Sequence, residues 1–264
     1  MPESSVLSKR KETYLRGLAS RAVRESRGHF LAEGVRVIEE ALAGAMRVTD
    51  IVGTPSASGD IERWTSEGRL RHVHVSVADE RVFRTLSTVG QEQGVLAVVE
   101  ASPALLPDRP PRGPVLLLDR VQDPGNAGTL LRTLRATGGD LAIALAGTVD
   151  LFNPKVVRSS AGSLFHVRLA TGVSLDAAVA WMVERALPLV ALDPAGESLF
   201  ESGWIPRGPF ALAVGNEGAG LDARLLEAAA ERLALPMAGG VESLNAGVSG
   251  SVALYELTRR GRAV

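Results

Sequence analysis

The sequence predicts an α/β protein with two domains, the second built on a parallel sheet with helices on both sides. Three observations lead to this fold class. The chain has 264 residues, enough for two hydrophobic cores. Short apolar runs alternate with helix-like segments along most of its length. A proline-rich segment divides the alternation into two series, so we predict domains at 1–102 and 115–264 and a linker at 103–114.

The first series predicts a small α/β domain. It begins with a helix over residues 5–20, followed by a short strand that starts at His29 and stops at Gly34. Apolar residues then recur at helical spacing from Val35. Three further strands and two further helices follow, with strands at 48–52, 73–77 and 95–99 and helices at 61–67 and 79–86.

The linker is predicted from its prolines. Five of the chain's 14 prolines lie between residues 101 and 114. Proline removes a backbone donor and restricts φ, so this segment suits an extended connector better than a helix or a central strand.

The second series predicts a parallel sheet. Its strands are short and apolar throughout, as expected for strands buried on both faces, and they lie at 115–118, 141–145, 187–192, 210–214 and 233–235. Helical segments separate them, at 126–136, 154–160, 175–186, 222–229 and 245–260.

Composition and charge restrict the classes of function. The absence of cysteine excludes a thiolate nucleophile and Cys-ligated zinc. The amino terminus is polar and no apolar run is long enough to cross a bilayer, so we expect a cytoplasmic protein without a membrane partner. The net charge is −1, yet residues 1–27 hold seven Lys and Arg against three Asp and Glu. Such a segment is either a phosphate-binding stripe or a solvated helix face.

Ligands of parallel sheets gather at the carboxyl ends of the strands, and three loops there are unusual. In the first, residues 119–133, Asn126 is predicted to cap a helix and Arg132 lies under two turns further along. A guanidinium at that position could hold a phosphate in a fork. The alternative is that Arg132 pairs with Asp119 or Asp123.

The second and third loops are rich in glycine and small residues. Residues 214–221 place three glycines around Asn216-Glu217, which indicates unusual backbone angles or a ligand against the main chain. Residues 233–257 run from a strand through a turn to a helix, with Ser243 and Asn245 as helix-start residues. That helix has low intrinsic propensity, so a close contact with a ligand or another helix must stabilise it; a helix buried within one domain is the alternative.

Other ligand classes find little support. No Gly-Lys-Ser or Gly-Lys-Thr follows the glycines, and no convincing dinucleotide fingerprint is present. The histidines share no metal-ligand spacing with carboxylates, and we predict no metal for His29, His72, His74 and His166.

Taken together, the three loops resemble the three motifs of the SpoU/TrmH family of RNA ribose methyltransferases, within the SPOUT class. The matching segments are DRVQDPGNAGTLLRT at 119–133, AVGNEGAGL at 213–221 and LPMAGGVESLNAGVSGSVALYE at 235–256. Residues 152–162, which contain Arg158, resemble another family segment. Residues 30–42 and the Gln93-Gly94 turn resemble the substrate-binding domain that many members carry.

The resemblance implies S-adenosylmethionine as methyl donor, a deep trefoil knot in the second domain, and a homodimer with active sites at the subunit interface. By the same resemblance the reacting centre is assigned to Asn126, Arg132, Glu217, Ser243 and Asn245. The donor pocket is assigned to Leu192, Gly215, Asn216, Gly218, Leu235, Met237 and Leu244. RNA contacts are assigned to Lys9, Arg10, Lys11, Arg21, Arg27 and Arg158.

The expected reaction is methylation of a ribose 2′-hydroxyl in rRNA or tRNA. The family assigns the position of Arg132 as general base, but a guanidinium stays protonated. A phosphate contact from Arg132, with Ser243 or a water passing the proton, is the physically easier role. Two alternatives stay open, a base-methylating enzyme of the same fold and a non-catalytic RNA-binding protein.

Overall fold

The computed structural model describes residues 5–87, 93–101, 103, 105–239 and 243–262. The chain groups into two compact units, the first formed by 1–102 with 152–165 and the second by 103–151 with 166–264. Residues 152–165 therefore pack with the amino-terminal unit, whereas the sequence placed them in the domain at 115–264. The proline-rich segment belongs to the second unit, where the indole N–H of Trp181 donates to the Pro107 carbonyl at 2.7 Å.

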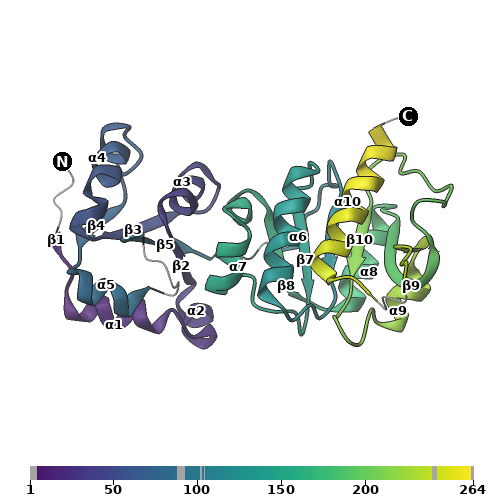
Figure 1. Cartoon of the computed structure of the whole chain (residues 1–264), viewed down its shortest axis with the longest axis horizontal. Helices are drawn as coiled ribbons and strands as arrows, with labels where there is room; N and C mark the ends of the chain where they lie inside the picture. The colour runs from purple at the N-terminus through teal and green to yellow at the C-terminus, as the bar shows by residue number, and fades with distance from the viewer. Residues whose placement is uncertain (1–4, 88–92, 102, 104, 240–242, 263–264) are drawn as a thin grey trace. The chain divides into compact units, whose positions relative to one another are not determined.

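The first unit contains a five-stranded mixed sheet (Figure 1). Its strands, in the order β1-β4-β3-β5-β2 across the sheet, are β1 (Ser5–Val6), β4 (His74–Val77), β3 (Val48–Gly53), β5 (Val95–Glu100) and β2 (His29–Glu33). β1, β4 and β3 are parallel, and β5 is antiparallel to both of its neighbours. The helix predicted over 5–20 is wrong at its start, because Ser5 and Val6 pair with Ser76 and Val77.

Helices cover this sheet, and most were predicted, although α2 was not and α1 and α4 have different bounds from those predicted. They are α1 (Lys9–Gly17), α2 (Arg21–Arg27), α3 (Val35–Ala43), α4 (Ser58–Ser66), α5 (Glu80–Leu86) and α7 (Pro154–Ser159), with the short 3₁₀ helices η1 (Pro55–Ala57) and η2 (Ser163–His166). Phe30 of β2 explains why α7 belongs here. Its ring lies 5.0 Å from that of Phe152 and 6.1 Å from that of Phe165, so aromatic packing holds both ends of the 152–165 segment to this unit.

The second unit contains a six-stranded parallel sheet, as predicted. In the order β11-β9-β10-β6-β7-β8 its strands are β11 (Glu231–Ala234), β9 (Leu189–Ser198), β10 (Ala211–Val214), β6 (Val115–Leu118), β7 (Leu141–Leu145) and β8 (Arg168–Val173). β8 was not predicted. It is an edge strand whose sequence, RLATGV, lacks the continuous apolar run of the central strands.

Helices lie on both faces of this sheet (Figure 1). They are α6 (Pro124–Ala136), α8 (Leu175–Glu184), α9 (Ala223–Ala228) and α10 (Ala246–Arg262). Trp181 and Met182 of α8 join the core of one face. On the other face α10 packs closely on α6, because a Cβ added at Gly250 would lie 2.4 Å from Leu130 Cδ2. In the described part of the chain, no helix is long and apolar enough to cross a membrane.

Candidate active site

The candidate site lies at the carboxyl ends of β6 and β10. These two strands are neighbours in register, with Leu118 paired to Val214. The chain passes from β6 to β7 and β8 on one side of the sheet and later returns to β9 and β10 on the other. β6 is therefore the point where the strand order reverses, which is where parallel sheets bind ligands. The loops 119–123 and 215–222 meet there although about ninety residues separate them.

The first loop leads into α6 through an aspartate cap. Asp123 Oδ1 accepts from the Asn126 backbone N–H at 2.8 Å, and Pro124 occupies the first turn. The predicted capping by Asn126 is therefore wrong, because proline without an N–H suits the first helical position and leaves Asp123 as the cap. Asn126 lies inside the first turn and is only 5% exposed. Because Asp123 caps the helix instead, the side-chain amide of Asn126 is free to reach the second loop.

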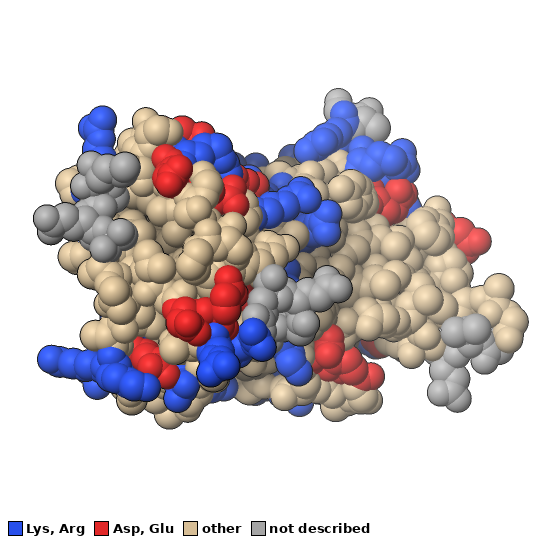
Figure 2. Space-filling model, turned by 60° about the vertical axis from the view of Figure 1, so that its left-hand side comes forward, with Lys and Arg blue, Asp and Glu red and all other residues tan. Residues whose placement is uncertain are grey.

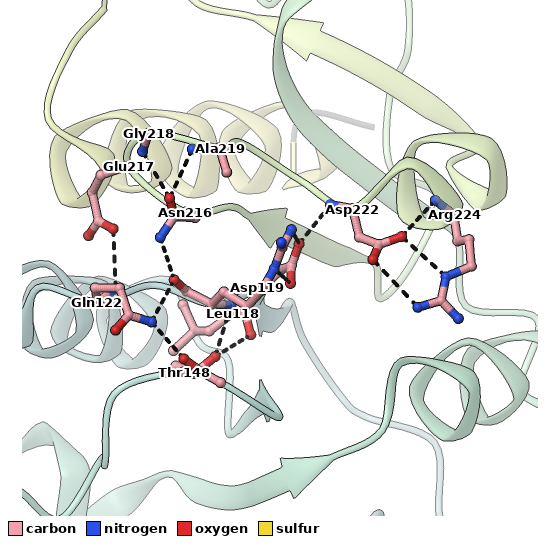
Figure 3. A network of polar contacts seen from close by, with 12 residues as sticks. Leu118, Asp119, Gln122, Thr148, Asn216, Glu217, Gly218, Ala219, Asp222 and Arg224 are labelled. Atoms are coloured by element: carbon pink, nitrogen blue, oxygen red, sulfur yellow. Dashed lines mark hydrogen bonds and ion pairs between the residues drawn. The ribbon is translucent and has the colours of Figure 1, made fainter.

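Glu217 of the second loop closes over the start of α6 (Figure 3). Its Oε1 accepts from the Asn126 side-chain amide at 2.9 Å and from the Asp123 N–H at 3.2 Å, and its Oε2 accepts from the Gln122 N–H at 3.2 Å. Burial alone would raise the pKa of Glu217, but hydrogen bonds from Asn126 and from backbone N–H groups outweigh burial and hold the pKa below its usual value. The ionised carboxylate thus fixes the orientation of the Asn126 amide, and the amino end of a helix favours its charge.

The glycine-rich loop around Asn216 is closed by its own hydrogen bonds (Figure 3). Asn216 Oδ1 accepts from the Gly218 and Ala219 N–H groups at 3.0 and 2.9 Å, and its Nδ2 donates to the Arg120 carbonyl at 2.9 Å. A Cβ at Gly215 would lie 2.5 Å from the Gly220 carbonyl carbon. Gly220 has a left-handed φ of 67°, so the reading of unusual backbone angles is confirmed there, and the reading of a ligand against the main chain stays a prediction.

Asp119 and Arg120 anchor the first loop and were not assigned a role from the sequence. Asp119 is 2% exposed. It accepts from the Arg120 guanidinium at 2.8 and 2.9 Å and from the Asp222 N–H at 2.7 Å, which joins the two loops (Figure 3). Arg120 takes a left-handed backbone with φ of 55°. The signal that could have identified Asp119 is an acidic residue directly after a fully apolar strand.

Arg132 makes no hydrogen bond or ion pair with the residues that the structure describes, and its side chain is exposed. The alternative pairing with Asp119 or Asp123 is wrong, since Asp119 holds Arg120 and Asp123 caps α6. Arg132 is therefore available to a ligand, as a fork for phosphate requires.

The third loop leads into α10 through Asn245. Its Oδ1 accepts from the Val248 N–H at 3.2 Å, which confirms Asn245 as a helix-start residue. A Cβ at Gly247 would lie 3.1 Å from both Asn126 Oδ1 and Asn245 Oδ1, so the two amides flank this glycine. Ser243 and Leu244 are exposed beside them. Residues 240–242 of the third motif lie outside the described residues.

The residues assigned to the donor pocket follow three neighbouring strands, β9, β10 and β11. In β9 the ladder with β11 breaks after Ala191, which pairs with Arg232, and resumes at Glu197, which pairs with Leu233. Leu192 begins this bulge. Leu235 follows β11, and beyond it Met237 and Leu244 are exposed by 37% and 44%. Partly exposed apolar side chains of this kind are suited to contact the adenosine of a nucleoside donor.

The basic residues assigned to RNA contact differ in whether a carboxylate of the protein already pairs with them. Lys11 forms an ion pair with the buried Asp50, so its ammonium already has a partner within the protein, and its assignment to RNA stays a prediction. Lys9 pairs with Glu12 at 3.4 Å and Arg21 with Glu25 at 2.7 Å. Three exposed members have side chains with no hydrogen bond or ion pair to the described residues, namely Arg10, Arg27 and Arg158.

The segment 9–27 is basic by count, with seven Lys and Arg against Glu12 and Glu25, but several of these cations are paired with carboxylates. Figure 2 shows the same arrangement on the face turned to the viewer, where Lys and Arg side chains alternate with Asp and Glu and do not form one unbroken basic surface. Of the two interpretations offered by the sequence, the solvated helix face fits the part of this segment whose cations are paired. Only individual cations remain for phosphate contact.

A family model decides which class of protein this site belongs to. Residues 113–255 match the SpoU rRNA Methylase family, and residues 11–97 match an MRM3-like substrate binding domain. The chain belongs to the SpoU rRNA methylase family. The resemblance drawn from the three loops is thereby confirmed, and so is the reading of the amino-terminal unit as a substrate-binding domain. The SpoU match covers all three loops of the candidate site.

Similar SpoU methylases are known in sequence and in structure. The 23S rRNA (guanosine(2553)-2′-O)-methyltransferase of Bacillus subtilis is 33% identical over 86% of this chain and 88% of its own length. The 23S rRNA (uridine(2479)-2′-O)-methyltransferase of Streptomyces viridochromogenes is 30% identical over 92% and 87%. An AdoMet-bound rRNA methyltransferase from Sinorhizobium meliloti superposes with a TM-score of 0.83 at 27% identity over 97% and 96%.

Proposed function

We propose that this SpoU methylase transfers a methyl group from S-adenosylmethionine to a ribose 2′-hydroxyl of ribosomal RNA. The observation that carries the proposal is the joining of the three motif loops, in which Glu217 orients the Asn126 amide and Asn245, the cap of α10, lies with Asn126 beside Gly247. Relatives named as 23S rRNA 2′-O-methyltransferases support both the ribose target and the choice of rRNA over tRNA.

The donor site is proposed at the carboxyl ends of β9, β10 and β11. Main-chain groups at Gly215, Leu235 and Leu244 would hold the donor, with Leu192 and Met237 covering its apolar parts. The AdoMet-bound relative supports this choice of cofactor. S-adenosylmethionine supplies an electrophilic methyl on a sulfonium, so the chain's own residues need only orient the acceptor and move a proton.

The residues of the reacting centre divide into two roles. Arg132 grips a phosphate of the target nucleotide in a fork and places the ribose. Asn126 contacts the acceptor region while Glu217 positions it, and the low pKa of Glu217 keeps that carboxylate from taking the proton at neutral pH. The proton of the 2′-hydroxyl is relayed through the Ser243 hydroxyl or a water beside it to bulk solvent.

We also propose a homodimer formed through α10. Its side chains Val248 and Tyr255 are 47% and 56% exposed, and Leu244 precedes them on the same segment. An apolar face of this kind suits an interface related by a twofold axis. Light scattering with size-exclusion chromatography tests it: a dimer mass is expected, which Val248→Glu should convert to a monomer mass. The deep knot and the cytoplasmic location stay predictions.

The experiment for the function is methyl transfer to 23S rRNA transcribed in vitro from the Bacillus subtilis gene, with methyl-labelled S-adenosylmethionine. The product is digested to nucleosides and analysed by mass spectrometry. We expect the label on ribose, because the proposed site orients a sugar hydroxyl. Label on a base would overturn the ribose assignment, and donor binding without any transfer to this RNA or to tRNA would favour a non-catalytic RNA-binding protein.

A further inference from the structure

We propose that a basic hollow on the opposite edge of the sheet binds a backbone phosphate of the RNA, remote from the reacting ribose. This hollow, of about 300 Å³, lies in the second unit where β6 and β10 begin, since Pro114 and Phe210 precede those strands. Its rim carries Arg112, Arg207 and Arg262. The candidate active site lies where the same strands end.

The hollow is basic because no carboxylate neutralises the arginines on its rim. All three arginines are exposed, and no Asp or Glu is among the residues that line the hollow. Arg112 and Arg207 make no hydrogen bond or ion pair with the described residues, and Arg262 donates only to the Thr137 carbonyl at 3.4 Å. In a protein of net charge −1, three such cations around one hollow create a local positive potential.

This pattern differs from that of the surface arginines that carboxylates neutralise. Arg168 pairs with Asp140 at 2.8 Å, and Arg224 pairs with Asp176 and Asp222 at 3.1 and 3.2 Å. Pairing with a carboxylate is thus a common arrangement on this surface, and the hollow lacks it. Planar guanidinium groups match the tetrahedral oxygens of phosphate in forked pairs, which makes phosphate the chemical group that best complements the rim.

The walls of the hollow also suit a small polar group. Four glycines line it, including Gly208, whose surroundings hold no atom within 4 Å of an added Cβ. Backbone is therefore accessible to a ligand. Thr258 lines the hollow as well, and its hydroxyl is buried without a hydrogen-bond partner among the described residues. A hydroxyl can donate a hydrogen bond, so Thr258 offers an unused polar group at the wall of the hollow.

RNA is the source of phosphate that the position favours. The arginines stand on the exposed rim, where a polyanion can contact all of them in turn. α10 begins at the candidate active site and its last turns line the hollow, and its 17 residues span about 25 Å. A phosphate held there belongs to a part of the RNA well away from the methylated nucleotide. This step rests on the proposed function only in taking RNA as the substrate.

The test compares full-length Arg112→Gln/Arg207→Gln with Arg109→Gln. Arg109 is a matched control, because it is exposed and unpaired in the same segment but does not line the hollow. Binding to 23S rRNA transcribed in vitro is measured from 50 to 200 mM salt. The double variant should bind about tenfold more weakly, and the slope of log K against log salt should fall by about 1.5, as loss of two phosphate contacts requires. Arg109→Gln should match the wild type, and all three should bind S-adenosylmethionine equally.

Three results would overturn the proposal. Equal rRNA affinity and salt slope for the double variant and Arg109→Gln would remove the hollow from RNA binding. An equal loss in both variants would show a diffuse charge effect without a site. Wild-type binding of inorganic phosphate that the double variant loses, with rRNA binding unchanged, would make the hollow a site for a small anion. These measurements need no methyl transfer. The proposal for the hollow can therefore be refuted independently of the ribose assignment.

Discussion

The two halves of the candidate active site differ in how strongly the protein itself holds them. The loops after β6 and β10 are joined by hydrogen bonds from Asp119, Asn216 and Glu217, and their glycines fit against neighbouring backbone. The segments after β11 and before α10 expose Met237 and Leu244 and make few polar contacts in the described part. The comparison teaches that the fold itself preorganises one half, and we expect ligand binding to complete the other.

The largest expected effect is on catalysis. It comes from substituting Arg132 of α6, whose side chain has no partner among the described residues. Arg132→Ala should lower kcat/KM for rRNA methylation by about a hundredfold, close to 2.7 kcal/mol, because the phosphate of the target nucleotide loses its fork. The melting temperature should stay unchanged, since Arg132 bonds no described residue. Steady-state kinetics and calorimetry measure both.

Arg132→Lys sharpens this result, because lysine keeps the charge but loses the planar fork. Activity near that of the wild type in this variant would contradict the forked contact.

The next effect is on stability, at the contact between α10 and α6. Gly250→Val should lower the free energy of unfolding by about 3 kcal/mol, because even its Cβ would lie 2.4 Å from Leu130 Cδ2 and 2.9 Å from Val214 Cγ2. Thermal unfolding measures the change. Gly59→Ala is the control, as nothing lies within 4 Å of its added Cβ. An unchanged stability of Gly250→Val would show that α10 does not pack closely on α6 at this position.

A smaller loss is expected where the carboxylate closes over α6. Glu217→Gln should cost about 1 to 2 kcal/mol, because Gln122, Asp123 and Asn126 then donate to a neutral group. The native pKa of Glu217 is lowered, so its contribution is complete above the ordinary value near 4.5 and is lost as pH falls through the native value. Wild-type stability should therefore decline more steeply than that of Glu217→Gln below pH 4.5. Parallel acid profiles for the two would refute the role given to this carboxylate.

The smallest effect is expected in the segments after β11 and before α10, which expose Met237 and Leu244. Leu244→Ser should weaken S-adenosylmethionine binding about fivefold, since an apolar contact of roughly 1 kcal/mol is lost, and should leave the melting temperature of the free protein unchanged. Calorimetric titration measures the affinity. A stability loss without a change in donor affinity would place Leu244 in the scaffold and remove the contrast between the two halves.

Much of the fold follows from local pattern, and the exceptions have physical reasons. The predicted strands at 115–118 and 141–145 match β6 and β7 at both ends, because buried parallel strands are apolar throughout. β8 was missed because an edge strand tolerates Arg168 and Gly172. β1 was missed because a strand of two residues carries no periodicity.

The candidate site was predictable in position but not in its contacts. Strand order at a parallel sheet brings the loops 119–133 and 213–221 together, so Asn126 and Glu217 could be named from the motifs. Which side chain caps α6 depended on Pro124, a signal that was present but given no weight. The ion pair of Lys11 with Asp50, 39 positions apart in sequence, and the unpaired side chain of Arg132 both depend on tertiary packing that no spacing reveals.

The most direct test of the central claim is a crystal structure of the protein with S-adenosylmethionine bound. The account predicts the donor at the carboxyl ends of β9, β10 and β11, against the main chain of Gly215 and Leu244, with its methyl turned toward Asn126 and Arg132. The preorganised loops 119–126 and 215–222 should keep their positions, while Met237 and Leu244 become covered. A donor bound elsewhere, or a site at Gly215 and Leu244 that stays closed under saturating donor, would contradict the account.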